Sequence, residues 1–226
     1  MADSSVDSEN LKIFFLGQEK AALELDNNRR HKIQAWLQEY PLPPSGHALD
    51  IGCWKGEFFE LLPEGWHHTG LDLERHPELP SDVTFVSGSA SEPLPFPDAS
   101  FELIFAGEII EHLLETSRFL AECHRVLKQG GRLVLTTPNL SCWLNAIRWL
   151  MLEQPWCVDC DTGENGHVRY FAPRVLARKL RAAGFEIIKL TSVGGLEGFR
   201  RFPRFYTGLF RLFPLRGKCL MCLAQK

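Results

Sequence analysis

The stretch Ala48-Leu49-Asp50-Ile51-Gly52-Cys53-Trp54-Lys55-Gly56 places an apolar run directly before a turn that holds two glycines. An apolar run of this kind predicts a strand, and the glycines allow the backbone of the turn to approach a ligand closely. Asp72 follows Gly52 by 20 positions, at the end of a second β-prone run. A carboxylate there can accept hydrogen bonds from both hydroxyls of a ribose. These features together predict a nucleotide-like ligand at the turn.

The helix expected after this turn opens with an acidic residue, Glu57. A dinucleotide would place its pyrophosphate at the N-terminus of that helix, where backbone N–H groups favour anions. Because Glu57 would repel phosphate, the sequence favours a cofactor without phosphate. S-adenosylmethionine is such a cofactor, since it joins an adenosine to a zwitterionic methionine tail.

Short β-prone runs alternate with helical stretches along the rest of the chain, which predicts an α/β fold with a doubly wound, mostly parallel sheet. Seven strands are expected, at 47–51, 69–73, 83–86, 101–106, 132–136, 185–190 and 219–224. Helices are expected at 57–62, 109–114, 116–127 and 173–183. Gly130 is expected near the C-cap of the third helix, and Gly184 follows the fourth, which has Pro173 in its first turn.

The segments on either side of this pattern suggest the domain organisation. Apolar residues recur at helical spacing over 11–40, until a cluster of prolines begins at Pro41. We therefore expect a helical segment over 1–44 and a main domain over 45–226. Within that domain, the tryptophan-rich stretch 139–171 is expected to form a lid or a substrate-facing insertion.

Composition excludes several classes of protein. The 226 residues carry 25 Lys plus Arg against 28 Asp plus Glu, so no basic field attracts nucleic acid along the whole chain. Seven cysteines, an odd number, do not describe a disulfide framework. The acidic start MADSSVDSEN does not resemble a secretory signal, and no run of 18 apolar residues predicts a membrane span. We expect a cytoplasmic protein.

The chain resembles the class I S-adenosylmethionine-dependent methyltransferases. Leu49–Gly56 is similar to the first motif of that family, and Gly70-Leu71-Asp72 is similar to its acidic second-strand motif. Further similar motifs follow in order at 88–90, 94–104, 108–113, 125–131, 136–139, 167–171 and 183–185. The subgroup that looks nearest contains ubiquinone-biosynthesis-like O-methyltransferases and bacterial enzymes acting on small molecules.

The resemblance implies a seven-stranded Rossmann-like methyltransferase fold, S-adenosylmethionine as cofactor and S-adenosylhomocysteine as product. It also implies a set of cofactor-binding residues: Asp50, Gly52, Gly56 and Asp72, then Ser89 and Ala90 at the adenine, and Gly107 and Glu108 along the cavity. Two residues depart from the family pattern. Trp54 stands where glycine is usual, so its side chain either crowds the methionine tail or points outward. Ser89 stands where aspartate is frequent.

Methyl transfer needs alignment of the acceptor with the cofactor's methyl group rather than a covalent nucleophile. If the acceptor is a hydroxyl on a small molecule, a base beside the methyl group can remove its proton. His112 and His167 are the candidates, because imidazole titrates near neutral pH. His112 can equally hydrogen-bond to backbone at a helix start.

Metal binding is a secondary hypothesis. On a helix, Glu108, Glu111 and His112 share one face at i, i+3 and i+4 and can present their side chains to a divalent cation. The same glutamates can instead cap the helix or approach the cofactor. Cys157 and Cys160 form a weaker candidate pair. Cys219 and Cys222 lie three apart in an expected strand, where they face opposite sides and belong to the core.

The tail over 196–226 is basic and aromatic, which suits either weak contact with a membrane surface or ordinary core packing. Two alternative functions stay open at this point. One is methylation of an RNA or other nucleic-acid terminus with help from a metal site, although nucleic acid is not the favoured partner. The other is a non-catalytic methyltransferase fold that binds a partner, suggested by Trp54 and Ser89.

Overall fold

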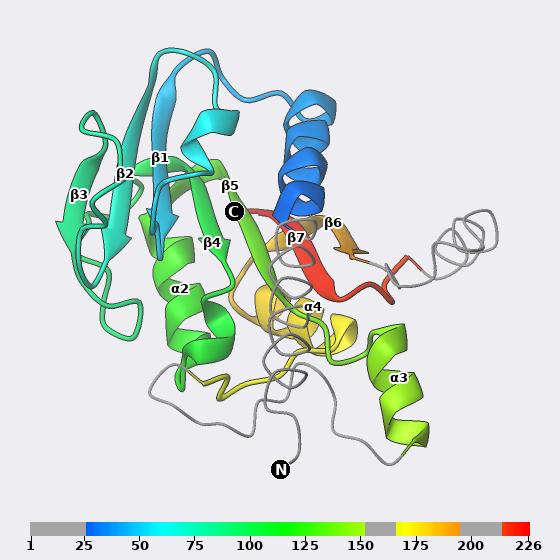
Figure 1. Cartoon of the computed structure of the whole chain (residues 1–226). Helices are drawn as coiled ribbons and strands as arrows, with labels where there is room; N and C mark the ends of the chain where they lie inside the picture. Colours follow the sequence, from blue (N-terminus) through cyan, green and yellow to red (C-terminus); the bar gives the residue numbers. More distant parts are fainter. Residues whose placement is uncertain (1–25, 152–165, 195–213) are drawn as a thin grey trace, which may run out of the picture.

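The computed structural model describes residues 26–151, 166–194 and 214–226. Its strands form one sheet in the order β3-β2-β1-β4-β5-β7-β6 (Figure 1). Their bounds are β1 Gly46–Ile51, β2 Trp66–Asp72, β3 Thr84–Ser87, β4 Phe101–Gly107, β5 Leu127–Pro138, β6 Glu186–Val193 and β7 Cys219–Gln225. All seven strands expected from the sequence are present, and the prediction of a mostly parallel α/β sheet is confirmed.

The strand pairing determines where a ligand can bind. β1 pairs in parallel with β2 on one side and with β4 on the other, and β5 continues the parallel series after β4. β7 is antiparallel to both β5 and β6. The chain thus leaves β1 toward β3 and later returns to the other side of β1 as β4. In open α/β sheets, ligands bind beyond the carboxyl ends of the strands at this kind of switch point.

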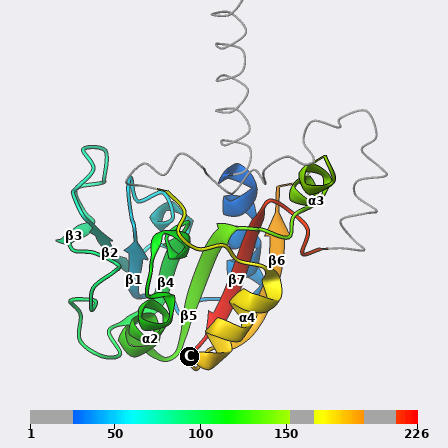
Figure 2. The same ribbon diagram turned by 90° about the horizontal axis from the view of Figure 1, so that it is seen from below.

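Alternate residues of each central strand face opposite sides of the sheet, and each side is covered by helices. Leu49 and Ile51 share one buried cluster with residues of α2 (Thr116–Val126) and α4 (Pro173–Ala182). On the other side, Ile33 and Trp36 of the helical residues 26–39 pack in a second cluster with Leu103 and Phe105 of β4. Figure 2 shows this layered arrangement, with α2 and α4 side by side along the sheet.

The two helices expected directly after β1 and β4 are wrong in type. Each is a single 3-10 turn, η1 at Phe59–Leu61 and η2 at Ile110–His112. Glu108, the residue before the N-cap of η2, has a left-handed backbone with φ of +51°, and Leu113, the residue after η2, is extended. An α-helix therefore cannot continue beyond η2 in either direction.

The expected ends of the longer helices are partly confirmed. Pro173 occupies the first turn of α4, and Gly184 follows its C-cap residue Ala183 with φ of +96°, as predicted. The prediction for Gly130 is wrong. α2 ends at Val126 and the chain turns directly into β5 at Leu127, so Gly130 lies inside that strand, with φ of +78°.

Several other expectations concern the segments beyond the sheet. The expected lid contains α3, at Trp143–Leu150, while residues 152–165, with Cys157 and Cys160, lie outside the described residues. The same holds for residues 1–25 and for most of the basic aromatic tail. Among the helices that the structure describes, none combines the length and the apolar character needed to cross a bilayer. Cys219 and Cys222 are buried in opposite core clusters, which confirms their assignment to the core.

Candidate cofactor site

A cavity opens beside the turn that follows β1 and the end of β4, at the switch point of the sheet. Its lining combines backbone of the glycine turn with charged side chains: Asp26, Arg29, Asp50, Gly52, Cys53, Trp54, Lys55, Glu57, Phe58, Gly107 and Glu108. Four of the eight expected cofactor-binding residues are therefore brought together here, namely Asp50, Gly52, Gly107 and Glu108.

Two of these residues are glycines at which a side chain would bring strain or a close contact. Gly52 has φ of +75°, and its N–H donates to the carbonyl of Leu71 at 2.8 Å, which fixes the turn against β2. A Cβ on Gly107 would lie 2.9 Å from Cε2 of Phe58, closer than carbon atoms can approach without movement. Glycine at both positions therefore avoids strain in the turn after β1 and a close contact with Phe58 at the end of β4.

Trp54 adopts a left-handed backbone with φ of +45°, and 61% of the residue is exposed. Its ring lies beside that of His76, with centroids 4.2 Å apart. Of the two orientations left open by the sequence, the outward one is observed: the indole lies at the surface beside His76. The strained conformation is the cost of a bulky residue where glycine is easiest to accommodate.

Asp72, at the end of β2, is linked to the glycine turn. Its Oδ2 accepts the N–H of Trp54 at 3.0 Å and its Oδ1 accepts the N–H of Leu73 at 2.8 Å. Asp72 also pairs with Ser87 of β3, and its carbonyl accepts the N–H of Gly88 at 2.9 Å, one residue before Ser89. Asp72 and Ser89 therefore follow adjacent strands at the same edge of the sheet.

Among the residues that the structure describes, the other expected cofactor-binding residues do not line this cavity. Gly56 is buried in the packing beneath the turn, where an added Cβ would lie 2.9 Å from Cδ1 of Leu79. Ser89 accepts the N–H of Ser91 through its Oγ at 3.1 Å, and Ala90 packs against the core. The cavity thus includes the part of the site expected for the methionine tail but not the part expected for the adenine.

Sequence reasoning missed Arg29, which enters the cavity from the helical residues 26–39. Its Nη1 lies 3.2 Å from Oε1 of Glu108, and its Nη2 donates to Oδ1 of Asp26 at 2.9 Å. Burial acts to lower the pKa of Arg29, but the carboxylates of Glu108 and Asp26 outweigh it, so the pKa is raised. Helical spacing places Arg29 four residues before the buried Ile33, but no local pattern shows which distant strand it meets.

The cavity contains one buried acidic atom and one buried basic atom without hydrogen-bond partners. They are Oδ1 of Asp50, a residue only 1% exposed, and Nε of Arg29. Burial raises the pKa of Asp50 well above its usual value, and the charges of Asp72 and Glu57 raise it further. Buried polar atoms are rarely left unpaired, so both atoms indicate a ligand. The ammonium and carboxylate of a methionine tail fit this pair of opposite charges.

Glu108 is held by contacts from three separate elements. Its N–H donates to the carbonyl of Thr136 at 3.1 Å, and its Oε1 accepts from Oγ1 of Thr136 at 2.8 Å. The same Oε1 accepts the S–H of Cys219 at 3.3 Å and pairs with Arg29. Because Glu108 precedes a 3-10 turn, the helical face expected to carry Glu108, Glu111 and His112 does not form.

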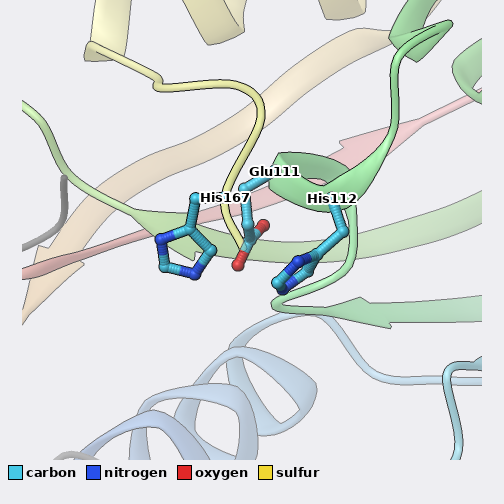
Figure 3. Close-up of side chains that lie close together, drawn as sticks. All are labelled: Glu111, His112 and His167. Atoms are coloured by element: carbon cyan, nitrogen blue, oxygen red, sulfur yellow. The ribbon is translucent and has the colours of Figure 1, made fainter. Parts of the chain in front are cut away.

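Glu111 instead lies close to the two candidate bases, His112 and His167. Figure 3 shows the carboxylate of Glu111 between the two imidazoles, whose ring centroids are 5.0 Å apart. Glu111 is 1% exposed; Thr137 donates its hydroxyl to Oε2 at 2.9 Å, and Oε1 has no partner. Burial, and then the charge of Glu108, raise the pKa of Glu111 above its usual value.

Backbone hydrogen bonds place His167 in this group. The N–H groups of Val168 and Arg169 both donate to the carbonyl of Glu111 at 2.9 Å, and the hydroxyl of Tyr170 donates to the carbonyl of His167 at 3.0 Å. Phe171 then forms a parallel bridge with Asn139, directly after β5. Two histidines separated by 55 positions are thereby held together near the end of β4.

The strand order and the cavity at the switch point define a Rossmann-like cofactor-binding fold. A family model described as a methyltransferase domain matches residues 25–190. A probable S-adenosylmethionine-dependent methyltransferase of Mycobacterium tuberculosis is 48% identical over 129 residues, covering 52% of this chain and 45% of that protein. A ubiquinone biosynthesis O-methyltransferase of Aromatoleum aromaticum is 27% identical over 166 residues, covering 69% of this chain and 70% of that protein.

A solved structure of the 1,6-didemethyltoxoflavin-N1-methyltransferase of Burkholderia thailandensis, with bound 1,6-didemethyltoxoflavin and S-adenosylhomocysteine, has the same fold. Its TM-score is 0.60 at 19% identity, covering 100% of this chain and 91% of that one. Because the family model matches most of the sequence, the chain belongs to the class I S-adenosylmethionine-dependent methyltransferase family. The resemblance stated from the motifs is confirmed. The chain spans about half the length of the mycobacterial relatives it matches.

Proposed function

We propose that this chain transfers a methyl group from S-adenosylmethionine to a hydroxyl oxygen of a small-molecule acceptor. The observation that carries the proposal is a pair of buried cavity atoms without hydrogen-bond partners, Oδ1 of Asp50 and Nε of Arg29. Together with family membership, it supports binding of a zwitterionic amino-acid tail beside the glycine turn. When bound, S-adenosylmethionine supplies an electrophilic methyl group on a positively charged sulfur.

Residues of this chain would hold the cofactor in three places. The carboxylate of Asp50 would accept from the ammonium group, and the guanidinium of Arg29 would donate to the carboxylate of the tail. Asp72 would receive the ribose hydroxyls at the end of β2, because each of its oxygens keeps a second lone pair free for a further donor. Ser89 and Ala90 would lie against the adenine, and Gly56 would support the turn from beneath.

His112 and His167 would face the acceptor, since the turn that carries His112 begins directly after the cavity residues Gly107 and Glu108. Either imidazole can take the proton of an acceptor hydroxyl near neutral pH. A small-molecule hydroxyl is favoured because one relative is named a ubiquinone biosynthesis O-methyltransferase. A nucleic-acid terminus is disfavoured because the whole chain carries 25 Lys plus Arg against 28 Asp plus Glu, which gives no overall basic field for phosphates.

Calorimetric titration with S-adenosylhomocysteine, followed by transfer of a radiolabelled methyl group from S-adenosylmethionine to a panel of phenols and sugars, tests the proposal. We expect micromolar or tighter binding and label on an acceptor oxygen. No detectable binding of S-adenosylhomocysteine, or binding without transfer to any acceptor class, RNA included, would support the non-catalytic alternative. Transfer to RNA that falls steeply with added salt would support the nucleic-acid alternative.

A further inference from the structure

Glu111, His112 and His167 each present one atom that can bind a metal, and these three atoms all lie within 4.8 Å of one another. The group is assembled from two segments, η2 and residues 167–169, and the backbone hydrogen bonds from Val168 and Arg169 to Glu111 fasten one segment to the other. The close approach is therefore a property of the folded backbone.

An independent observation indicates that Glu111, His112 and His167 bind a ligand. Oε1 of Glu111 is buried without a hydrogen-bond partner, although the residue is only 1% exposed. The other oxygen, Oε2, is already held by Thr137, which orients the carboxylate. A buried acceptor atom without a hydrogen-bond donor destabilises the folded protein, unless a cation or a donor group of a ligand binds to it. In Figure 3 this carboxylate lies between the two imidazoles.

We propose that Glu111, His112 and His167 form a binding site for a divalent transition metal, with two imidazole nitrogens and one carboxylate oxygen as ligands. This donor set suits Zn²⁺, Co²⁺ or Fe²⁺ better than Mg²⁺ or Ca²⁺, which prefer oxygen ligands only. Three protein ligands leave at least one coordination position open, as in catalytic zinc sites. An acceptor oxygen can occupy that position.

The geometry requires a small adjustment on binding. Zinc bonds of about 2.1 Å in tetrahedral geometry place neighbouring donor atoms roughly 3.4 Å apart. The widest separation in the group must therefore close by somewhat more than an ångström. Side-chain rotation of the two half-buried histidines, His112 and His167, can provide this while Thr137 keeps Glu111 in place. The site differs from the one expected from sequence, because His167 replaces Glu108.

The inference deepens the proposed function and rests on it for the role of the metal. In the metal-bound form, the two histidines would act as ligands instead of proton acceptors, and the metal would polarise the acceptor hydroxyl. The binding of metal itself needs neither cofactor nor acceptor. It can therefore be tested separately from methyl transfer.

The 226-residue chain is treated with a chelator, dialysed, and titrated with Co²⁺ and Zn²⁺. The titration measures the heat released and the visible d–d absorption of Co²⁺. We expect one equivalent to bind, with a four- or five-coordinate Co²⁺ spectrum that lacks thiolate charge-transfer bands. Glu111→Gln and His167→Gln should each weaken binding by roughly 100-fold or more, because loss of a second-sphere partner alone costs 10–100-fold. The matched controls Glu115→Gln and His31→Ala, both exposed, should bind as the unmodified chain does.

Circular dichroism on each variant separates loss of the site from loss of the fold, and His167→Gln serves if Glu111→Gln does not fold. The inference is overturned if the unmodified chain binds no metal, if both variants bind as tightly as the controls, or if thiolate bands appear. Titration of the same metal-free protein with S-adenosylhomocysteine tests the proposed function independently, so either conclusion can fail alone.

Discussion

Nη1 of Arg29 lies 3.2 Å from Oε1 of Glu108, which joins the helix before the sheet to the residue directly after β4. The two side chains are 16% and 30% exposed, so the pair is partly shielded from water. Both line the cavity beside the glycine turn. The helix over 26–39 is therefore a structural part of the proposed cofactor site.

Arg29→Gln should weaken binding of S-adenosylhomocysteine by roughly 10- to 100-fold, since a hydrogen bond to a charged group contributes about 1.5–3 kcal/mol. Isothermal titration calorimetry measures this directly. The neighbouring Arg30→Gln is the control, because Arg30 pairs with Glu60, which does not line the cavity. Equal affinity of the two variants would remove Arg29 from the site.

Asp72→Ala should weaken cofactor binding more than Asp72→Asn does. Alanine removes both the proposed ribose acceptor and the bond to the N–H of Trp54, whereas asparagine keeps one acceptor oxygen. We expect the alanine variant to lose roughly 30-fold or more in affinity for adenosine-containing ligands, consistent with about 2 kcal/mol for a charged hydrogen bond. Unchanged adenosine binding in both variants would contradict the proposed role of Asp72.

Trp54→Gly should raise the free energy of unfolding by about 1 kcal/mol, because glycine adopts the left-handed backbone without the strain that a side chain brings. Urea denaturation at neutral pH measures the change. Trp54→Ala separates backbone strain from the lost contact with His76, since alanine keeps a Cβ and should give no gain. A glycine variant less stable than the alanine variant would refute the explanation by strain.

Asp50→Asn should remove a pH dependence of stability. The folded-state pKa of Asp50 is raised, so the folded chain holds a proton that the unfolded chain releases above pH of about 4. Stability attributable to Asp50 therefore falls as pH rises above the unfolded value, and continues to fall until pH passes the folded pKa. Unfolding free energies of both proteins from pH 4 to 8 should diverge, with the variant gaining relative to the unmodified chain.

Cofactor binding gives a second measurement on the same residue. An ammonium group placed beside Asp50 would favour its charged form and release the bound proton. Calorimetric titration in buffers of different ionisation enthalpy should therefore detect proton release in the unmodified chain and none in Asp50→Asn. Proton release of equal size in both would show that another group is responsible.

Local sequence patterns predict the sheet well, because a strand is marked by a short apolar or β-prone run of neighbouring residues. The apolar run before Gly52 forms β1, and the β-prone runs around Asp72 and Gly107 form β2 and β4, as expected. The parallel pairing of these strands then brings Asp50, Gly52, Gly107 and Glu108 to a single edge. Spacing along the chain is enough to find this part of the site.

The remaining features depend on contacts between distant segments, which spacing does not reveal. Glu108 adopts a left-handed backbone while its side chain pairs with Arg29, and this removes the helical face assumed for a metal triad. His167 joins Glu111 only because Val168 and Arg169 hydrogen-bond to the carbonyl of Glu111. The roles expected for Asp72, Ser89 and Ala90 at the cofactor, and the domain boundary at 44, stay predictions.

The position of β7 has a consequence for how the molecule is made. β7 comes after β6 in the chain but lies between β5 and β6 in the sheet. While a ribosome has synthesised the protein only as far as Val193, β6 has no strand to pair with, and the flank of β5 presents unbonded peptide groups. Completion of the sheet during biosynthesis must therefore wait for Cys219–Gln225 to leave the exit tunnel, and until then the nascent molecule carries an open, aggregation-prone edge.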